Sequence, residues 1–313
     1  MLPLFSRYQL RKANISEARK GIALAAWLPV LLLFASATAA QDSSPAAPAA
    51  RSELFDRVVG NQKQSELELD HYERIQSTES RKTGGDPRPS STKVLRLFPA
   101  GPAIYKMTLG PDGNPISTEG YRNDLEKLER YLTWALQDGP AQKEAYAKAE
   151  RKRKERFDLI EATHQAFTFS LVGRELRGDR TLLRYAMEPN PKYRPTSRNT
   201  TLFTKVRGTL WIDEQSSQLA KVEGTVTDDI SLSLFLAKVY KGSHFMQERY
   251  EVASGIWEPT FEQYDFDGRK FLLPFSIHER TFYTNYRFVG PPAKAIEVVR
   301  GELSKLRPES SSH

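Results

Sequence analysis

Carboxylates and histidines are the side chains of this sequence that could do chemistry. The chain has 313 residues and no cysteine, which excludes a thiol nucleophile, a disulfide framework and a thiolate metal site. Its five histidines are scattered, and only His244 and His278 could meet, across neighbouring strands. The sequence contains neither a Gly-x-Ser-x-Gly nucleophile motif nor a phosphate-binding glycine loop. We therefore expect no metal ion, no cofactor and no catalytic residue.

Several aspartates occupy positions where apolar runs end, among them Asp213, Asp265 and Asp267. Two inward carboxylates could act as general acid and general base. An aspartate at a strand end more often forms a turn, because its side chain bonds the nearby backbone. In GTLWIDEQSSQLAKVEG, alternation runs into Asp213 and resumes at Leu219. We predict that the Asp213 carboxylate caps backbone N–H groups of a hairpin turn, and that a carboxylate-based hydrolase is the weakest hypothesis.

The first 40 residues have the order of an export signal. Basic residues precede the apolar run GIALAAWLPVLLLF, and Ala37-Thr38-Ala39 fits a cleavage site. An uncleaved anchor from Gly21 to Ala40 is the alternative. These residues carry +4 of the formal charge of +7, so the remaining charge is too small to suggest a nucleic-acid site. We expect residues 1–40 to be removed and the protein to be periplasmic or secreted.

The rest of the chain is predicted to be one domain. Residues 41–50 are rich in Pro, Ala and Ser and form a linker, and a β domain covers 51–303. Ser52 is placed to cap a helix with Leu54, Phe55, Val58 and Val59 on one face. A helical insertion, dense in Lys and Arg in its second half, is expected at 122–163. Residues 304–313 are expected to be a disordered tail.

Alternation with a period of two dominates from Ala166 onward. The runs are rich in Val, Thr and aromatic residues, and their short turns, one of them at Asp267-Gly268, favour antiparallel neighbours. Residues 67–82 are more polar and are predicted to be an edge strand. The fold class expected is mainly β (α+β): a strongly curved antiparallel sheet or unclosed β-barrel, covered by the N-terminal helix and the helical insertion.

The faces of these strands suggest where a ligand could bind. In GTLWID, Leu210 and Ile212 share one face with Val206, and Trp211 lies on the other. Later strands are apolar on both faces, so each face needs a cover or encloses an apolar ligand. The ligand-binding candidates, chosen by size and strand position, are Trp211, Phe235, Phe245, Trp257, Phe261 and Phe275.

This order of segments resembles the LolA/LppX-type periplasmic lipoprotein-sorting proteins over roughly Arg51 to Val289. The resemblance rests on the export signal, the mid-chain helices, the hairpin G-T-L-W-I-D…K-V-E-G, and the segments FLAKVYKGSHF and IWEPTFEQYDFDGRKFLL. It implies an unclosed β-barrel whose concave apolar face is covered by helices and accommodates acyl chains. LolA itself carries outer-membrane lipoproteins between membranes.

The resemblance leads us to expect an exported, non-enzymatic protein of the cell envelope that binds a lipid or other apolar ligand. A role in lipid or lipoprotein trafficking is then expected, with envelope proteins or a membrane surface as further partners, no nucleic acid, and a monomeric state. The alternative is a structural or interaction protein of the envelope in which side chains fill the cavity.

Overall fold

The structure is a computed structural model that describes residues 48–81, 89–232, 237–270 and 273–306. Within them, one antiparallel sheet has the order β3-β2-β1-β12-β11-β10-β7-β6-β5-β4, and β9 pairs with β11 and with β8. The outermost strands of this order, β3 and β4, each pair with one neighbour, so the sheet is unclosed. The strands are β1 (Tyr72–Arg81), β2 (Ser91–Pro99), β3 (Ile104–Leu109), β4 (Phe167–Arg177), β5 (Arg180–Pro189), β6 (Val206–Asp213), β7 (Leu219–Val226), β8 (Ile230–Leu232), β9 (Ala237–Val239), β10 (His244–Ala253), β11 (Ile256–Lys270) and β12 (Leu273–Phe288).

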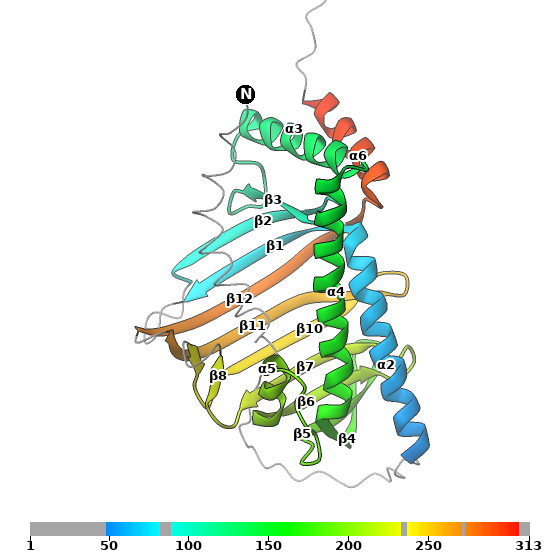
Figure 1. Ribbon diagram of the computed structural model, residues 1–313, viewed down its shortest axis with the longest axis vertical. Helices are drawn as coiled ribbons and strands as arrows, with labels where there is room; N and C mark the ends of the chain where they lie inside the picture. The colour runs from blue at the N-terminus through cyan, green and yellow to red at the C-terminus, as the bar shows by residue number, and fades with distance from the viewer. Residues whose placement is uncertain (1–47, 82–88, 233–236, 271–272, 307–313) are drawn as a thin grey trace, which may run out of the picture.

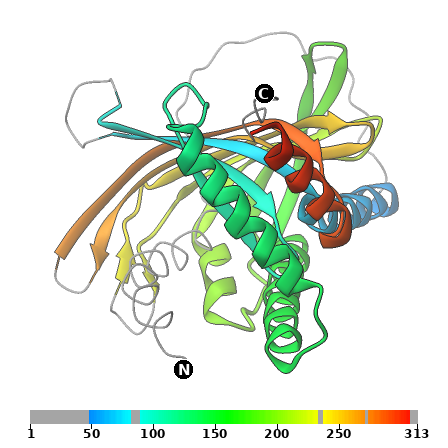
Figure 2. The same cartoon turned by 90° about the horizontal axis from the view of Figure 1, so that it is seen from above.

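Four long helices accompany the sheet within the described residues. They are α2 (Pro48–Glu68), α3 (Thr118–Ala135), α4 (Pro140–Ala166) and α6 (Pro292–Lys305), with short turns α5 (Arg198–Thr201), η1 (Leu69–His71) and η2 (Leu202–Lys205). Figure 1 shows α4 crossing the strands with α2 beside it, and α3 and α6 at the β3 end. Seen from above, the sheet curves strongly, and α4 lies on its concave side (Figure 2). The predicted fold class, a curved and unclosed antiparallel sheet with helical cover, is confirmed.

The two pairs of helices cover opposite faces of the sheet. Because side chains alternate along a strand, Tyr264 and Phe261 of β11 point to different faces. Tyr264 belongs to the core that contains Phe55 of α2 and Ala166 of α4. Phe261 pairs with Phe282 of β12, Phe282 with Ser77 of β1, and Ser77 with Val94 of β2, so these four residues share one face of the sheet. Phe98 lies on this face as well, four residues after Val94, and α3 and α6 form a second core around it. Each helix pair therefore buries its own apolar stripe.

Two sequence-based expectations about single elements need correction, and one helix was not predicted. Strand β1 is not at the edge, because it pairs with β2 and β12, and its polar side chains bond to neighbours, as Thr78 does to Thr281 at 3.0 Å. No turn forms at Gly268, because β11 continues to Lys270. A Cβ at Gly268 would lie 2.1 Å from the carbonyl oxygen of Lys238 on β9, so the glycine marks a close approach of two strands. Helix α6 was not anticipated.

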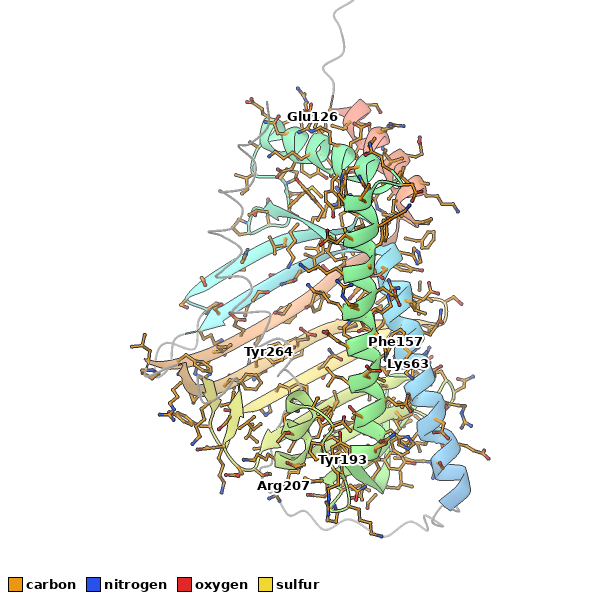
Figure 3. The ribbon with its side chains drawn as sticks, viewed as in Figure 1. Lys63, Glu126, Phe157, Tyr193, Arg207 and Tyr264 are labelled. Atoms are coloured by element: carbon orange, nitrogen blue, oxygen red, sulfur yellow. The ribbon has the colours of Figure 1, made fainter. Side chains whose placement is uncertain are left out.

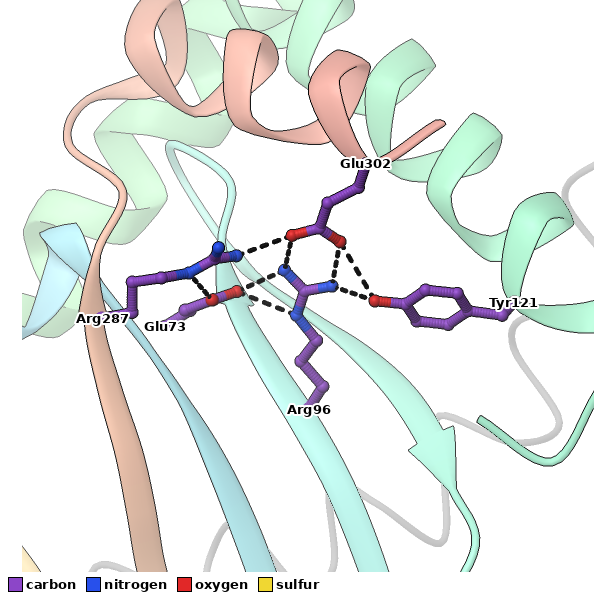
Figure 4. A network of polar contacts seen from close by, with 5 residues as sticks. All are labelled: Glu73, Arg96, Tyr121, Arg287 and Glu302. Atoms are coloured by element: carbon purple, nitrogen blue, oxygen red, sulfur yellow. Dashed lines mark hydrogen bonds and ion pairs between the residues drawn. The ribbon is translucent and has the colours of Figure 1, made fainter. Parts of the chain in front are cut away.

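A network of charged side chains ties α6 to the sheet (Figure 4). Arg96 of β2 donates hydrogen bonds to Glu73 of β1 at 2.8 Å and to Glu302 of α6 at 2.7 Å, and also bonds Tyr121 of α3. Arg287 of β12 donates to both glutamates, at 2.6 Å to Glu302. Burial opposes ionisation of Glu302, but hydrogen bonds from Arg96, Arg287 and Tyr121 and the charge of Arg96 outweigh it and lower its pKa to about 2. Two arginines balance two glutamates, which makes this burial tolerable.

Candidate functional site

An apolar cavity lies between α2, α4 and the concave face of the sheet. Its volume is about 70 Å³. Helix α2 contributes Phe55 and Val58, α4 contributes Ile160, and the sheet contributes side chains such as Val222 and Phe245. Phe55 closes one side, stacked on Phe169 with ring centroids 4.2 Å apart. Every side chain that the sheet contributes to this lining is apolar, so the sheet offers no hydrogen bonds to an occupant.

The polar groups at the cavity come from the helices. They are Gln62 of α2 and the consecutive residues Thr163 and His164 of α4. Thr163 Oγ1 donates to the carbonyl oxygen of Leu159 at 2.9 Å, so its hydroxyl proton is used within the helix. His164 stacks on Phe55 with ring centroids 5.9 Å apart. The helix side of the cavity is therefore the side on which a polar part of a ligand would lie.

Helices α2 and α4 are held together by a ladder of ion pairs. The side chains are Lys63 and Glu161 at 2.5 Å, Glu66 and Arg156 at 2.6 Å, and Asp70 of η1 and Arg153 at 2.7 Å. Figure 3 shows Lys63 and Phe157 where the two helices run side by side. Partly exposed ion pairs of this kind each contribute about 0–1 kcal/mol, because solvent screens them. The ladder makes the two helices a unit without adding a large barrier to separating them from the sheet.

Helix α2 makes a few polar contacts with the sheet. Asn61 Nδ2 donates to the carbonyl oxygens of Ser216 and Ser217 at 3.1 and 3.0 Å. Ser65 Oγ donates to the carbonyl oxygen of Trp257 at 3.0 Å. These bonds fix α2 to the β6–β7 turn and to the start of β11. The first half of α2 contacts the core through apolar side chains, among them Phe55 and Val58, and Arg57 Nε donates to Ser217 Oγ at 3.2 Å.

Asp213 has the structural role that the sequence predicted. Its Oδ1 accepts hydrogen bonds from the backbone N–H of Ser216 at 2.8 Å and from the Ser216 hydroxyl at 2.6 Å. The residue is 1% exposed, and Arg180 lies 3.4 Å from its Oδ2. Ser217, which follows in the turn, has φ of 55°. The carboxylate is thus used in closing the β6–β7 hairpin.

The predicted ligand-binding residues fall into separate places. Phe245 lines the cavity, and Phe275 packs half-buried against the same core. Trp211 and Trp257 lie in another buried cluster on the opposite face. Phe261 also lies on that face, with its ring centroid 5.1 Å from that of Phe282.

Phe235 lies outside the described residues. In the Trp cluster, Trp211 Nε1 donates to Glu175 at 2.9 Å, and Lys221 Nζ lies 4.6 Å from the ring centroid. Trp211 is therefore involved in contacts away from the cavity. Residues of the helices that line the cavity, such as Gln62, were not among the candidates, although their spacing from Phe55 and Val58 on α2 could have indicated them.

The two histidines that could have met do approach a common aspartate. His244 of β10, Asp265 of β11 and His278 of β12 are successive cross-strand partners, and His278 Nδ1 lies 3.0 Å from Asp265 Oδ1. Burial lowers the pKa of His244, although Asp265 and Glu223 act to raise it. Among the described residues, no group of three or more potential ligands could hold a metal ion.

Comparisons with known proteins give distant structural likenesses. No family model matches the chain, and no curated protein matches it. Similar solved structures include a candidate outer membrane lipoprotein-sorting protein domain of Vibrio parahaemolyticus (TM-score 0.32, 11% identity, 79% of this chain and 99% of that chain). A LolA superfamily protein of Nitrosomonas europaea (TM-score 0.30, 10% identity, 78% and 96%) and a DUF1329 family protein of Desulfovibrio piger (TM-score 0.27, 11% identity, 76% and 92%) are also similar.

Two of these names belong to the lipoprotein-sorting and LolA group that the sequence resembles. Within the described ranges, no helix has the length and apolar character needed to cross a membrane.

Proposed function

We propose that this chain is an exported, non-enzymatic binding protein of the bacterial cell envelope that holds an acyl chain or a similarly apolar ligand. The site is the space between the concave face of the sheet and the pair α2 and α4. The observation that carries the proposal is the cavity itself, whose sheet wall is entirely apolar and whose cover is a helix pair attached by few polar bonds. The export signal predicted for residues 1–40 supports a role in lipid or lipoprotein trafficking outside the cytoplasm.

Binding requires the helix pair to move away from the sheet. The cavity of about 70 Å³ is far below the range of roughly 300–1,000 Å³ that holds most ligands. Each methylene taken out of water contributes about 0.8 kcal/mol, so a twelve-carbon chain contributes about 10 kcal/mol before opposing terms. Each hydrogen bond of Asn61 or Ser65 contributes about 1 kcal/mol. An acyl chain could therefore offset the loss of these hydrogen bonds, and it would cover the apolar surface of the sheet that α2 exposes when it moves.

The small volume of the closed cavity favours a second candidate. In that case the protein is a structural or interaction protein of the envelope, and its side chains fill the space between helices and sheet permanently. The two candidates differ in one observable: only the first takes up a ligand into this space.

The test is to express the full chain in a bacterial host, recover the exported protein, and extract it with organic solvent for lipid mass spectrometry. The intact mass of the recovered protein shows whether the first 40 residues are removed. Purified protein is then titrated with a fluorescent fatty-acid probe. We expect co-purifying lipid and saturable probe binding, whereas lipid-free protein that does not bind the probe would support the second candidate.

Two variants locate the binding. Val222→Phe places a larger side chain in the cavity from β7, where Val222 is 3% exposed. Thr209→Phe makes the same change in size on the opposite face of the neighbouring strand β6. We expect Val222→Phe to weaken probe binding by about tenfold or more and Thr209→Phe to leave it unchanged. Equal effects of the two variants would place the ligand elsewhere.

A further inference from the structure

Gln62 is a polar residue in an apolar stripe. On α2 it follows Phe55, Val58 and Val59 at helical spacing, and all four line the cavity. Gln62 is 7% exposed, and its Nε2 is buried with no hydrogen-bond partner among the described residues. A buried amide N–H left without an acceptor is unfavourable, and an apolar side chain of the same size would avoid the penalty. A helix whose role is only to pack against the sheet is expected to carry an apolar side chain at this position, and Gln62 departs from that pattern.

The polar residues next to Gln62 on α2, and the other polar residues of the cavity lining, make contacts of their own. Asn61 and Ser65 of α2 donate to backbone carbonyl oxygens of the sheet at 3.0–3.1 Å. Thr163 Oγ1 donates within α4. His164 is directed to Asp56, with Nδ1 3.7 Å from Oδ1. Gln62 Nε2 is thus a buried donor at this cavity without a partner among the described residues, and it is not one of the contacts that dock α2 onto the sheet.

We propose that Gln62 donates a hydrogen bond to the carbonyl oxygen of a bound acyl group. This inference rests on the proposed function and gives the class of ligand: a neutral acyl ester or amide, with the carbonyl at α2 and the chain directed along Val222 and Phe245. Gln62 is a neutral donor, and the imidazole of His164 in the lining already lies 3.7 Å from the Asp56 carboxylate, so an ionised carboxylate would be buried without a countercharge of its own. A bare hydrocarbon would leave the Gln62 N–H without an acceptor.

The test compares three competitors of similar length for displacement of a fluorescent probe: methyl decanoate, tridecane and the decanoate anion. Methyl decanoate and tridecane have the same number of non-hydrogen atoms and differ in the ester group. We define the ester preference as the ratio of ester affinity to hydrocarbon affinity. We expect this ratio to be roughly 3- to 10-fold higher in the wild type than in a variant without the Gln62 amide, the size of one net hydrogen bond. The ester is also expected to bind more tightly than the anion.

The variant Gln62→Leu keeps the side-chain volume and removes the amide. It should bind tridecane at least as well as the wild type and lose the preference for the ester. The control Asn61→Leu changes the adjacent residue, whose amide is bonded to Ser216 and Ser217. This control should keep the ester preference even if α2 is held less firmly.

The outcomes separate the two proposals. Loss of the ester preference in Gln62→Leu, with tridecane binding retained, supports the role of Gln62. An ester preference in this variant equal to that of the wild type overturns that role and leaves the apolar site in place. Failure of the wild type to bind the probe and all three competitors overturns the apolar site itself.

Discussion

Glu258 of β11 offers the sharpest test of the energetics of this fold. The residue is 0% exposed, and neither carboxylate oxygen has a hydrogen-bond partner among the described residues. Its nearest cation is Arg249 of β10, with Nη2 3.7 Å from Oε2, and that Nη2 also donates to the carbonyl oxygen of Trp257. Burial raises the pKa of Glu258 to about 7, with Arg249 opposing the change and Glu66 of α2 adding to it.

The change to make is Glu258→Gln, which stays neutral at every pH. In the wild type the folded state keeps the Glu258 proton up to about pH 7, whereas the unfolded chain loses it near the ordinary value of 4.5. The stability of the wild type is therefore full below pH 4.5 and falls as the pH rises toward 7. Each pH unit between the two values corresponds to about 1.4 kcal/mol, which gives a total loss of about 3 kcal/mol.

The assay is urea unfolding of wild type and variant at pH values from 4 to 8. The difference between their free energies of unfolding should shift by about 3 kcal/mol over this range in favour of Glu258→Gln, or roughly 6 to 12 °C in Tm. Any constant cost of placing an amide beside Arg249 does not affect this shift. Glu188→Gln, at an exposed position of β5, controls for the loss of one negative charge. Parallel curves for wild type and Glu258→Gln would refute the reasoning.

Two further changes test the network and the close strand contact. Glu302→Gln should lower stability at neutral pH by up to about 3 kcal/mol, because the carboxylate with a pKa of about 2 contributes stability above pH 4.5 that is lost as the pH falls toward 2. Thermal melts should then converge with the wild type near pH 2, and a constant difference would contradict the assignment. Gly268→Ala should cost about 1–3 kcal/mol because its Cβ meets the carbonyl oxygen of Lys238, whereas Gly173→Ala, with nothing within 4 Å, serves as the control. Equal melting temperatures for the two alanine variants would show that β9 moves to make room for the new Cβ without a loss of stability.

Local patterns predicted the elements that local chemistry determines. The β6–β7 hairpin is an example, because strand alternation stops at Asp213 and its carboxylate caps the turn. The facing of the hairpin was predictable for the same reason, with Leu210 in the core and Trp211 on the other face. Helix α3 also has a local cause, because the Ser117 side chain caps its first turn and leucines at spacings of three and four residues form its buried stripe, although Ser117 was not recognised as a cap from the sequence.

Local patterns could not predict which strands pair when the strands are distant in the sequence. The position of β1 depends on pairing with β12, about 200 residues later, and the polar side chains of β1 do not indicate whether it has one neighbour or two.

Helix α6, in contrast, could have been predicted from local spacing. Its buried stripe is formed by Ala295, Ile296 and Val299, which follow two prolines at the start of the helix.

The residues of the candidate site were harder to predict than the fold, because strand order and register decide which face of the sheet a side chain lies on. Size and strand position selected Trp211 and Phe245 alike, yet strand order and register place Phe245 beneath α2 and Trp211 on the far face. Bulges add to this, because the register shift between Glu248 and Arg249 leaves Thr260 of β11 as an extra residue, and such a bulge redirects the side chains next to it. Side-chain size therefore identifies residues of a core but not which core.

Helix α2 links the stability of the protein to the proposed binding. Its apolar stripe closes the cavity through Phe55 and Val58, while Glu66, near its end, is among the charges that raise the pKa of Glu258 beneath it. Ionisation of Glu258 places a further negative charge against Glu66 and Glu68 of α2, which disfavours the docked helix. Opening of the site for a ligand requires the same helix to leave the sheet. Ionised Glu258 therefore favours the open position of α2 that a ligand needs. Glu258→Gln should weaken binding of the fluorescent fatty-acid probe at pH 8, where the wild-type residue is ionised, and have little effect at pH 4, where it is neutral.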